Sequence, residues 1–262
     1  MNKQENSSGK PLANSDWLKN HHLAKLSERT AFAKKLVNLH PKRIVDLGCA
    51  TGLWLDLLNQ LMPIECEFIG IDSDEESLKI AEKRSKNWER NNSFIQLDIE
   101  KDTTLIPPSD LTLAFNVFPY IQNLDRFLYI LSSRIPQGVL AVRQYDGAAI
   151  RFGPMETAVR QKIEIDLRVA TESSQKFHHY DLDRVFVALH NSLYKHSEFN
   201  FELFERTSPF SKDFIPYYNQ MLDWTSHNIS EISSKLLEEW LSNNDVSISR
   251  YFYEVDLVAL LS

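Results

Sequence analysis

Short apolar runs alternate with longer amphipathic stretches along most of this chain. The short runs predict buried strands, and apolar residues at three- and four-residue spacing predict helices between them. The predicted strands are 44–46, 67–72, 94–99, 110–116, 139–145, 199–204 and 250–261. The predicted helices are 16–39, 53–61, 74–90, 124–135, 155–169, 181–194 and 211–241, with breaks after Pro216 and near His227 left open. Strands that alternate with helices favour an α/β fold with a mostly parallel, doubly wound sheet.

The most informative stretch joins the first predicted strand to the helix after it. Asp46 ends the strand, and Gly48, Ala50 and Gly52 then form a turn of small residues. Such a turn lets the backbone approach a ligand closely, as in nucleotide-binding βαβ units. A dinucleotide-binding turn has the spacing G-x-G-x-x-G and seats a pyrophosphate, which the carboxylate of Asp46 would repel. The carboxylate favours a cationic cofactor that carries an amino group.

The stretch from Asp46 to Gly52, D-L-G-C-A-T-G, resembles the first motif of class I S-adenosylmethionine-dependent methyltransferases, D/E-x-G-x-G-x-G. Ala50 stands where the middle glycine is commonest, and an alanine there is mildly strained if its φ is positive. The resemblance covers residues 41–145 by motif. It implies a seven-stranded sheet of order 3-2-1-4-5-7-6 with an antiparallel last strand. It also implies S-adenosyl-L-methionine (SAM) as cofactor and S-adenosyl-L-homocysteine (SAH) as product.

Acidic residues also end the second and third predicted strands. Asp72, 20 residues after Gly52, is placed to accept both ribose hydroxyls of an adenosine. Asp98 can accept the adenine amino group, and Ile99 can pack on the ring. Parallel strands present their carboxyl ends at one edge of a sheet, so the three aspartates are expected together at the ligand-binding edge.

Further cofactor contacts are expected around this edge. Arg29 is the preferred partner of the cofactor carboxylate, because a guanidinium can bind a carboxylate bidentately; Trp17 and His22 are alternatives. The other expected contacts are Cys49, Ser73 and Asn116. Asn116 begins N-V-F-P-Y at the position of the fourth family motif, which differs from the N-P-P-Y of enzymes that methylate planar nitrogens. This difference disfavours a nucleic-acid or glutamine target.

The acceptor side offers several candidate catalytic residues. Tyr120 and Tyr145 follow or end the fourth and fifth strands, and the pair His178-His179 lies in a predicted loop. A general base is needed only if the acceptor is a hydroxyl or an acidic carbon. The candidates for it are His178, His179, Tyr180 and Asp146. The histidine pair lacks a third ligand at a clear spacing, so no metal is predicted.

Three residues are candidates for binding the substrate: Arg143, Arg151 and Tyr180. The two arginines would suit an acidic acceptor. An ion pair between Arg143 and Asp146 is the structural alternative.

Length and composition fit a soluble globular protein with reduced thiols. The 262 residues predict a disordered leader at 1–15 and a single domain at 16–262, with helical insertions at about 154–195 and 211–243 that could form a lid. Two cysteines provide no disulfide framework, and no secretory signal or membrane span is expected, so we expect a cytoplasmic protein. The net charge of −7 disfavours nucleic acid as a partner, although residues 1–43 carry nine Lys or Arg against three Asp or Glu. The oligomeric state stays open.

The leading hypothesis is methyl transfer from SAM to a small-molecule acceptor. A protein or RNA methyltransferase that uses the basic segment for docking is the second hypothesis. A non-catalytic, SAM-binding regulatory protein is the third. A nicotinamide-dependent oxidoreductase is disfavoured by Asp46 and Asp98.

Overall fold

The computed structural model describes residues 13–173, 181–243 and 249–262, which are built around one seven-stranded sheet. The strand order is β3-β2-β1-β4-β5-β7-β6, as the resemblance implies. Four parallel pairings join the first five strands, and β7 runs antiparallel between β5 and β6. The strands are β1 (Arg43–Leu47), β2 (Glu67–Asp72), β3 (Asn92–Gln96), β4 (Leu111–Phe115), β5 (Val139–Gly153), β6 (Ser197–Thr207) and β7 (Tyr251–Leu261).

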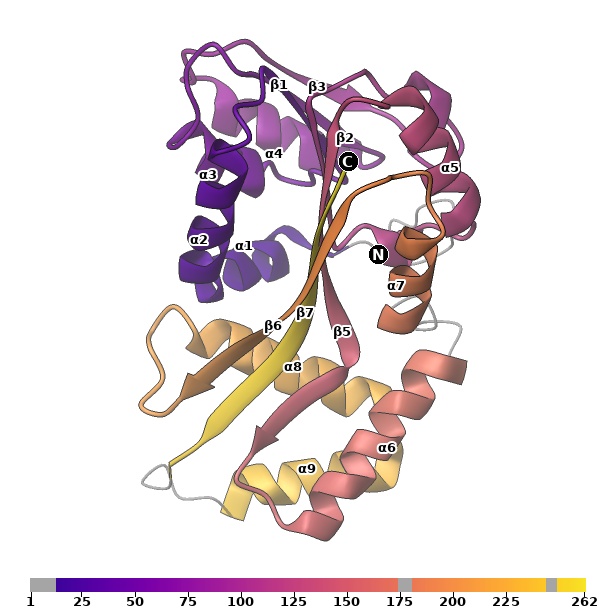
Figure 1. Ribbon diagram of the computed structural model, residues 1–262. Helices are drawn as coiled ribbons and strands as arrows, with labels where there is room; N and C mark the ends of the chain where they lie inside the picture. Colours follow the sequence, from indigo (N-terminus) through magenta and orange to yellow (C-terminus); the bar gives the residue numbers. More distant parts are fainter. Residues whose placement is uncertain (1–12, 174–180, 244–248) are drawn as a thin grey trace.

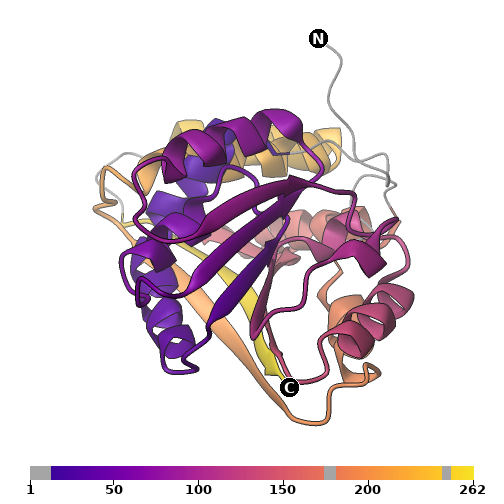
Figure 2. The same cartoon turned by 90° about the horizontal axis from the view of Figure 1, so that it is seen from above.

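Helices cover both faces of this sheet, because its central strands carry buried apolar side chains on both faces (Figures 1 and 2). One layer consists of α1 (Ser15–Ala24), α2 (Leu26–Val37), α3 (Leu53–Asn59) and α4 (Glu75–Ser85). The other consists of α5 (Leu124–Arg134) and α7 (Leu182–His190). The short 3₁₀ turns η1 (Thr103–Leu105) and η2 (Phe118–Tyr120) follow β3 and β4.

Three long strands carry the sheet beyond the parallel core. Residues 146–154 were expected to form a loop, but β5 continues to Gly153 after an irregularity in its pairing with β7. Tyr145 lies opposite Asp256 and Ile150 opposite Glu254, so residues 146–149 bulge out of the ladder. The helices α6 (Thr157–Ser173), α8 (Ile215–Asn228) and α9 (Glu231–Asn243) gather at this end, where they share a separate aromatic core with the long strands (Figure 1).

Several predicted boundaries differ from the structure. The helix expected at 16–39 is two helices that break at Lys25, and the side chain of Asn14 caps the first by accepting from the Trp17 N–H. The helix expected at 211–241 divides after Asn228, near His227, and has no break after Pro216. The third strand ends at Gln96 instead of residue 99.

The N-terminal leader and a membrane span were the two remaining expectations for whole segments. Most of the predicted disordered leader, residues 1–12, lies outside the described residues. In the described ranges, no helix has the length and apolar character needed to cross a bilayer.

Candidate functional site

The turn between β1 and α3 has an unusual backbone. Gly48, Ala50 and Gly52 all have positive φ, at 68°, 46° and 74°. A side chain at Gly48 would place its Cβ 2.8 Å from a methyl carbon of Val117, so this position requires glycine for space as well as for conformation. Ala50 has the left-handed conformation that was expected to strain it. These alternating left-handed residues curl the backbone at the carboxyl end of β1.

Asp72 holds this turn from the neighbouring strand. Its Oδ2 accepts the Ala50 N–H at 2.8 Å, and its Oδ1 accepts the Asp74 N–H at 2.9 Å. Burial raises the pKa of Asp72, and these backbone donors oppose that rise. The cap of α4 is a different residue, Asp74, whose side chain accepts from the Ser77 N–H. Asp72 is therefore oriented at the sheet edge, with carboxylate lone pairs still available to a ligand.

Asp46 lies near the end of β1, two residues before Gly48, and is only 2% exposed. Burial, together with the charge of Asp72, raises its pKa to about 8, while the charge of Arg29 opposes this rise. The two aspartates are thus close enough to influence each other. A cation placed between them would offset both the cost of burying an ionised carboxylate and the repulsion between the two aspartates.

Arg29 of α2 brings a buried positive charge to the same place. It is 7% exposed, and its guanidinium lies 5.0 Å from the centre of the Trp54 ring. Its nitrogens contact Nδ1 of His22 at 2.8 Å and Nδ1 of His21 at 3.3 Å. Burial and the charge of Arg29 lower the pKa of His22 to about 3 and lower that of His21, so both rings are neutral and accept.

The charge of Arg29 has no close counter-ion within the described ranges, since no carboxylate there lies within 4.0 Å of it. Burial lowers its pKa only to about 10, so the group stays charged at neutral pH. A buried cation in this state favours an anionic ligand. A cationic ligand would favour the ionised form of the nearby Asp46, so Arg29 and Asp46 together complement an amino acid, which has a carboxylate and an ammonium.

The remaining expected cofactor contacts are distributed along the same edge. Asp98 lies two residues beyond the end of β3, accepts the N–H groups of residues 100 and 101, and pairs with Lys101 at 3.1 Å. Ile99 is partly buried against the core on the α5 side. Cys49 is buried, and burial raises its pKa well above the ordinary value, so it stays a thiol. The Ser73 carbonyl accepts from Gln96 at 3.2 Å.

Asn116 and the two tyrosines meet where β4 and β5 end. Asn116 has a φ of +55°, and its Oδ1 accepts the Tyr145 N–H at 3.1 Å. Tyr120 ends η2, just beyond β4, and is partly exposed like Tyr145. Asp146 begins the bulge and accepts the Ala148 N–H at 2.9 Å, while burial raises its pKa. These residues line the sheet edge on the side away from Asp72.

The two arginines predicted to bind substrate form ion pairs within the protein. Arg143 is 5% exposed and pairs with Glu202 at 2.9 Å and Asp256 at 2.8 Å, and Asp146 is not among these partners. Arg151 pairs with Glu164 of α6 at 2.5 Å. The other predicted acceptor-side residues, His178, His179 and Tyr180, lie outside the described residues.

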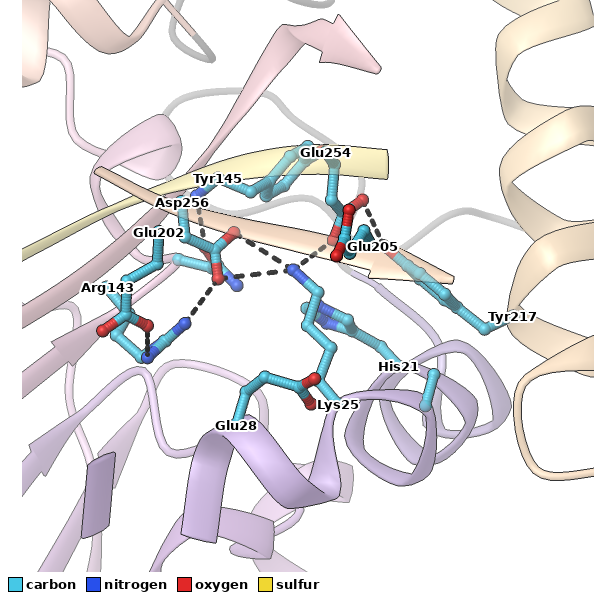
Figure 3. Close-up of polar contacts among 12 residues, drawn as sticks. His21, Lys25, Glu28, Arg143, Tyr145, Glu202, Glu205, Tyr217, Glu254 and Asp256 are labelled. Atoms are coloured by element: carbon cyan, nitrogen blue, oxygen red, sulfur yellow. Dashed lines mark hydrogen bonds and ion pairs between the residues drawn. The ribbon is translucent and has the colours of Figure 1, made fainter. Parts of the chain in front are cut away.

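A buried polar cluster around Lys25 was not predicted from the sequence (Figure 3). His21, which contacts Arg29, stacks on Tyr217 of this cluster. Lys25 forms ion pairs with Glu254 and Asp256 of β7, and the Tyr217 hydroxyl donates to Glu254 at 2.7 Å. One signal was available: Glu254 and Asp256 stand two apart in an apolar strand, and therefore on one face. The lysine that neutralises them gives no such signal.

Comparisons with known proteins agree on one family. A family model described as a methyltransferase domain matches residues 40–200. Trans-aconitate 2-methyltransferase from Rhodopseudomonas palustris (strain BisA53) is 29% identical over 136 residues, which are 50% of this chain and 51% of that protein. Carboxy-S-adenosyl-L-methionine synthase from Helicobacter pylori (strain Shi470) is 28% identical over 164 residues, 61% of this chain and 64% of that protein. The chain thus spans about half to just under two thirds of the length of these relatives.

Solved structures show the same fold at low sequence identity. A protein from Bacillus halodurans C-125 assigned as a methyltransferase has a TM-score of 0.56 at 12% identity, covering 88% of this chain and 97% of that one. The plantazolicin methyltransferase BpumL, solved with SAH, has a TM-score of 0.50 at 17% identity, covering 95% of this chain and 85% of that one. At these identities the likeness concerns the fold alone.

Proposed function

The chain belongs to the methyltransferase-domain family, and on that premise we propose that it transfers the methyl group of SAM to a small-molecule acceptor. The observation that carries the proposal is the buried guanidinium of Arg29 together with the buried carboxyl group of Asp46, beside a left-handed turn of small residues. SAM presents a carboxylate, an ammonium and a cationic sulfonium. The pair matches the first two groups, and the acidic edge matches the net positive charge.

Each residue of the edge has a role in this proposal. Arg29 binds the carboxylate of the cofactor, and Asp46 faces its cationic groups. Asp72 accepts the ribose hydroxyls while it keeps the turn in place. Asp98 and Ile99 form the adenine end of the site. The turn from Gly48 to Gly52 lies against the centre of the cofactor, where a side chain would leave no room.

Methyl transfer then takes place at the ends of β4 and β5. The reaction is an in-line displacement, in which the acceptor atom attacks the sulfonium methyl and neutral SAH leaves. Because the sulfonium is a good leaving group, positioning supplies most of the rate acceleration. In this proposal Tyr120 and Tyr145 hold the acceptor, and Asn116, whose side chain binds the Tyr145 N–H, contacts the cofactor. Among the candidates for a base, Asp146 is the one that lies within the described residues.

Three of the nine basic residues at 1–43 are engaged inside the protein, which leaves less positive charge for docking a macromolecule. Lys25 and Arg29 are both buried, so they cannot form a docking surface for RNA or an acidic protein. Arg43 pairs with Glu67 at 2.5 Å. The relatives are named for methylation of trans-aconitate and for synthesis of carboxy-S-adenosyl-L-methionine, and both names refer to small molecules, which supports a small acceptor.

Calorimetric titration with SAM and SAH tests the cofactor, and SAH release tests turnover. We expect saturable binding of both, and SAH formation when the protein is mixed with SAM and the low-molecular-weight fraction of a cell extract. The macromolecular fraction serves as the matched control, and methylation confined to it would overturn the acceptor assignment. Absence of SAM binding would overturn the proposal as a whole. Binding without turnover in either fraction would instead favour a regulatory SAM-binding protein.

A further inference from the structure

The break between α1 and α2 places a lysine inside the protein. Lys25 has non-helical dihedral angles, φ −107° and ψ 18°, and it separates the two helices by a single residue. Its side chain is 3% exposed. A lysine is seldom buried to this degree unless its charge is paired. The chain direction changes at this residue, so any contact of its side chain also fixes how α2 begins.

Two acidic residues of β7 receive the ammonium of Lys25 (Figure 3). It forms an ion pair with Glu254 and lies 3.0 and 3.3 Å from the two carboxylate oxygens of Asp256. Glu254 is fully buried and Asp256 is 5% exposed. Arg143 of β5 also pairs with Asp256, so the acids are held from both sides. The ammonium therefore has a fixed position against the sheet.

Two routes lead from this cluster to Arg29. The first runs along α2, where the Arg29 N–H donates to the Lys25 carbonyl at 2.9 Å, so Arg29 is one helical turn away on the same side. The second runs through side chains. The Tyr217 hydroxyl donates to Glu254, its ring stacks on His21 at 5.1 Å, and His21 contacts the Arg29 guanidinium. Both routes constrain the same guanidinium.

Simple attachment of the helix pair does not depend on Lys25. Arg206 of β6 donates to the Ala24 carbonyl at 2.8 Å and pairs with Glu28 at 2.8 Å, at the same junction. Burying three charges is expensive, and an apolar contact would usually attach a helix equally well. The charges at Lys25 therefore suit a different task, which is to fix position and direction.

We propose that Lys25 is a positioning residue for cofactor binding: pinned by Glu254 and Asp256, it sets the start of α2 and thereby the place of the Arg29 guanidinium. This inference rests on the proposed function, because it takes the amino-acid carboxylate of SAM as the ligand of Arg29. Lys25 itself does not touch the cofactor. It acts through Arg29, so its loss affects only ligands that carry the carboxylate.

Two ligands distinguish positioning from general damage. SAH has the amino-acid group, whereas 5′-methylthioadenosine has the same adenosine and sulfur but lacks it. We expect Lys25→Met to weaken the binding of SAH about tenfold, which is less than the roughly hundredfold loss in rate that a ~1 Å misplacement of a reacting group can cause. Affinity for 5′-methylthioadenosine is expected to stay within about twofold. Lys34→Met, at an exposed lysine of α2, is the matched control and is expected to change the affinity for neither ligand.

The outcomes separate this inference from the proposed function. If wild-type protein binds neither ligand, the proposed function fails and this inference fails with it. If wild-type protein binds SAH and Lys25→Met binds it equally well, only the inference is overturned. Equal losses for both ligands also overturn it, because they indicate a disturbed fold. Should Lys25→Met not fold, Tyr217→Phe keeps the ring and removes only the bond to Glu254. Tyr217→Phe is expected to lower the affinity for SAH about threefold and to leave the affinity for 5′-methylthioadenosine unchanged. An unchanged ratio of the two affinities overturns the inference.

Discussion

Replacing Asp46 by asparagine tests the central electrostatic argument. Asp46 is 2% exposed, and burial together with the charge of Asp72 raises its pKa from 3.8 to about 8. Asparagine has nearly the same shape and cannot ionise. The folded wild type must therefore keep a proton on Asp46 at neutral pH, whereas the unfolded chain has already lost it. Asp46→Asn removes this difference between the two states.

The size of the effect follows from the two pKa values. Between pH 3.8 and about 8 the folded state binds one more proton than the unfolded state, so wild-type stability falls as pH rises. Each pH unit is worth about 1.36 kcal/mol. From pH 5 to pH 7 the free energy of unfolding of Asp46→Asn, relative to wild type, should therefore rise by about 2.7 kcal/mol. Above pH 8 the difference should become constant.

Urea unfolding of both proteins at pH 5, 6, 7 and 8.5, without cofactor, measures this difference. We expect the variant to gain on the wild type at each step up to pH 8 and to bind SAM more weakly at every pH. Titration of the wild type with SAM at pH 7 should release close to one proton, since a cation beside Asp46 favours its ionised form. A difference in stability that does not change with pH would refute the reasoning.

Three further substitutions test other parts of the site. Arg29→Met should weaken SAM by about 1.5–3 kcal/mol through loss of a charge-assisted bond, and should spare 5′-methylthioadenosine in calorimetry; equal losses would remove Arg29 from the carboxylate. Asp72→Ala should weaken both ligands by a similar amount, because the ribose is common to them, and unchanged affinity would exclude Asp72 from the site. Gly48→Val should lower the melting temperature and abolish SAM binding, because its φ is +68° and a Cβ would lie 2.8 Å from Val117; normal binding would show that the cofactor lies elsewhere.

The sequence was most informative where structure is set locally. The small-residue turn at Gly48, Ala50 and Gly52 could be recognised because left-handed backbone depends on the residues themselves. Apolar runs located the central strands β1, β2 and β4, because burial on both faces leaves few polar positions there. The strand order came from the family resemblance, since apolar patterns do not say which strands are neighbours.

The errors arose where distant residues decide the outcome. Asp146 and Gly147 were typical of a loop, yet pairing with β7 extends the strand past them. The break at Lys25 has no local signal, because lysine is a good helix former and its partners are on β7. For the same reason Arg143 was assigned to substrate binding, although it pairs with Glu202 and Asp256. The role of Arg29 in binding the cofactor carboxylate stays a prediction, now with its surroundings known.

The ion pair between Lys25 and Asp256 joins residues 231 positions apart, and this separation bears on how the protein assembles. Contacts so distant in sequence form slowly, because the entropy of closing a long loop is lost before the contact contributes any stabilising free energy. The ammonium of Lys25 has its carboxylate partners only after β7 has entered between β5 and β6. On a ribosome, α2 could therefore pack its apolar face on β1 and α3 early, while the junction at Lys25 would gain its ion pairs only when the last strand is in place.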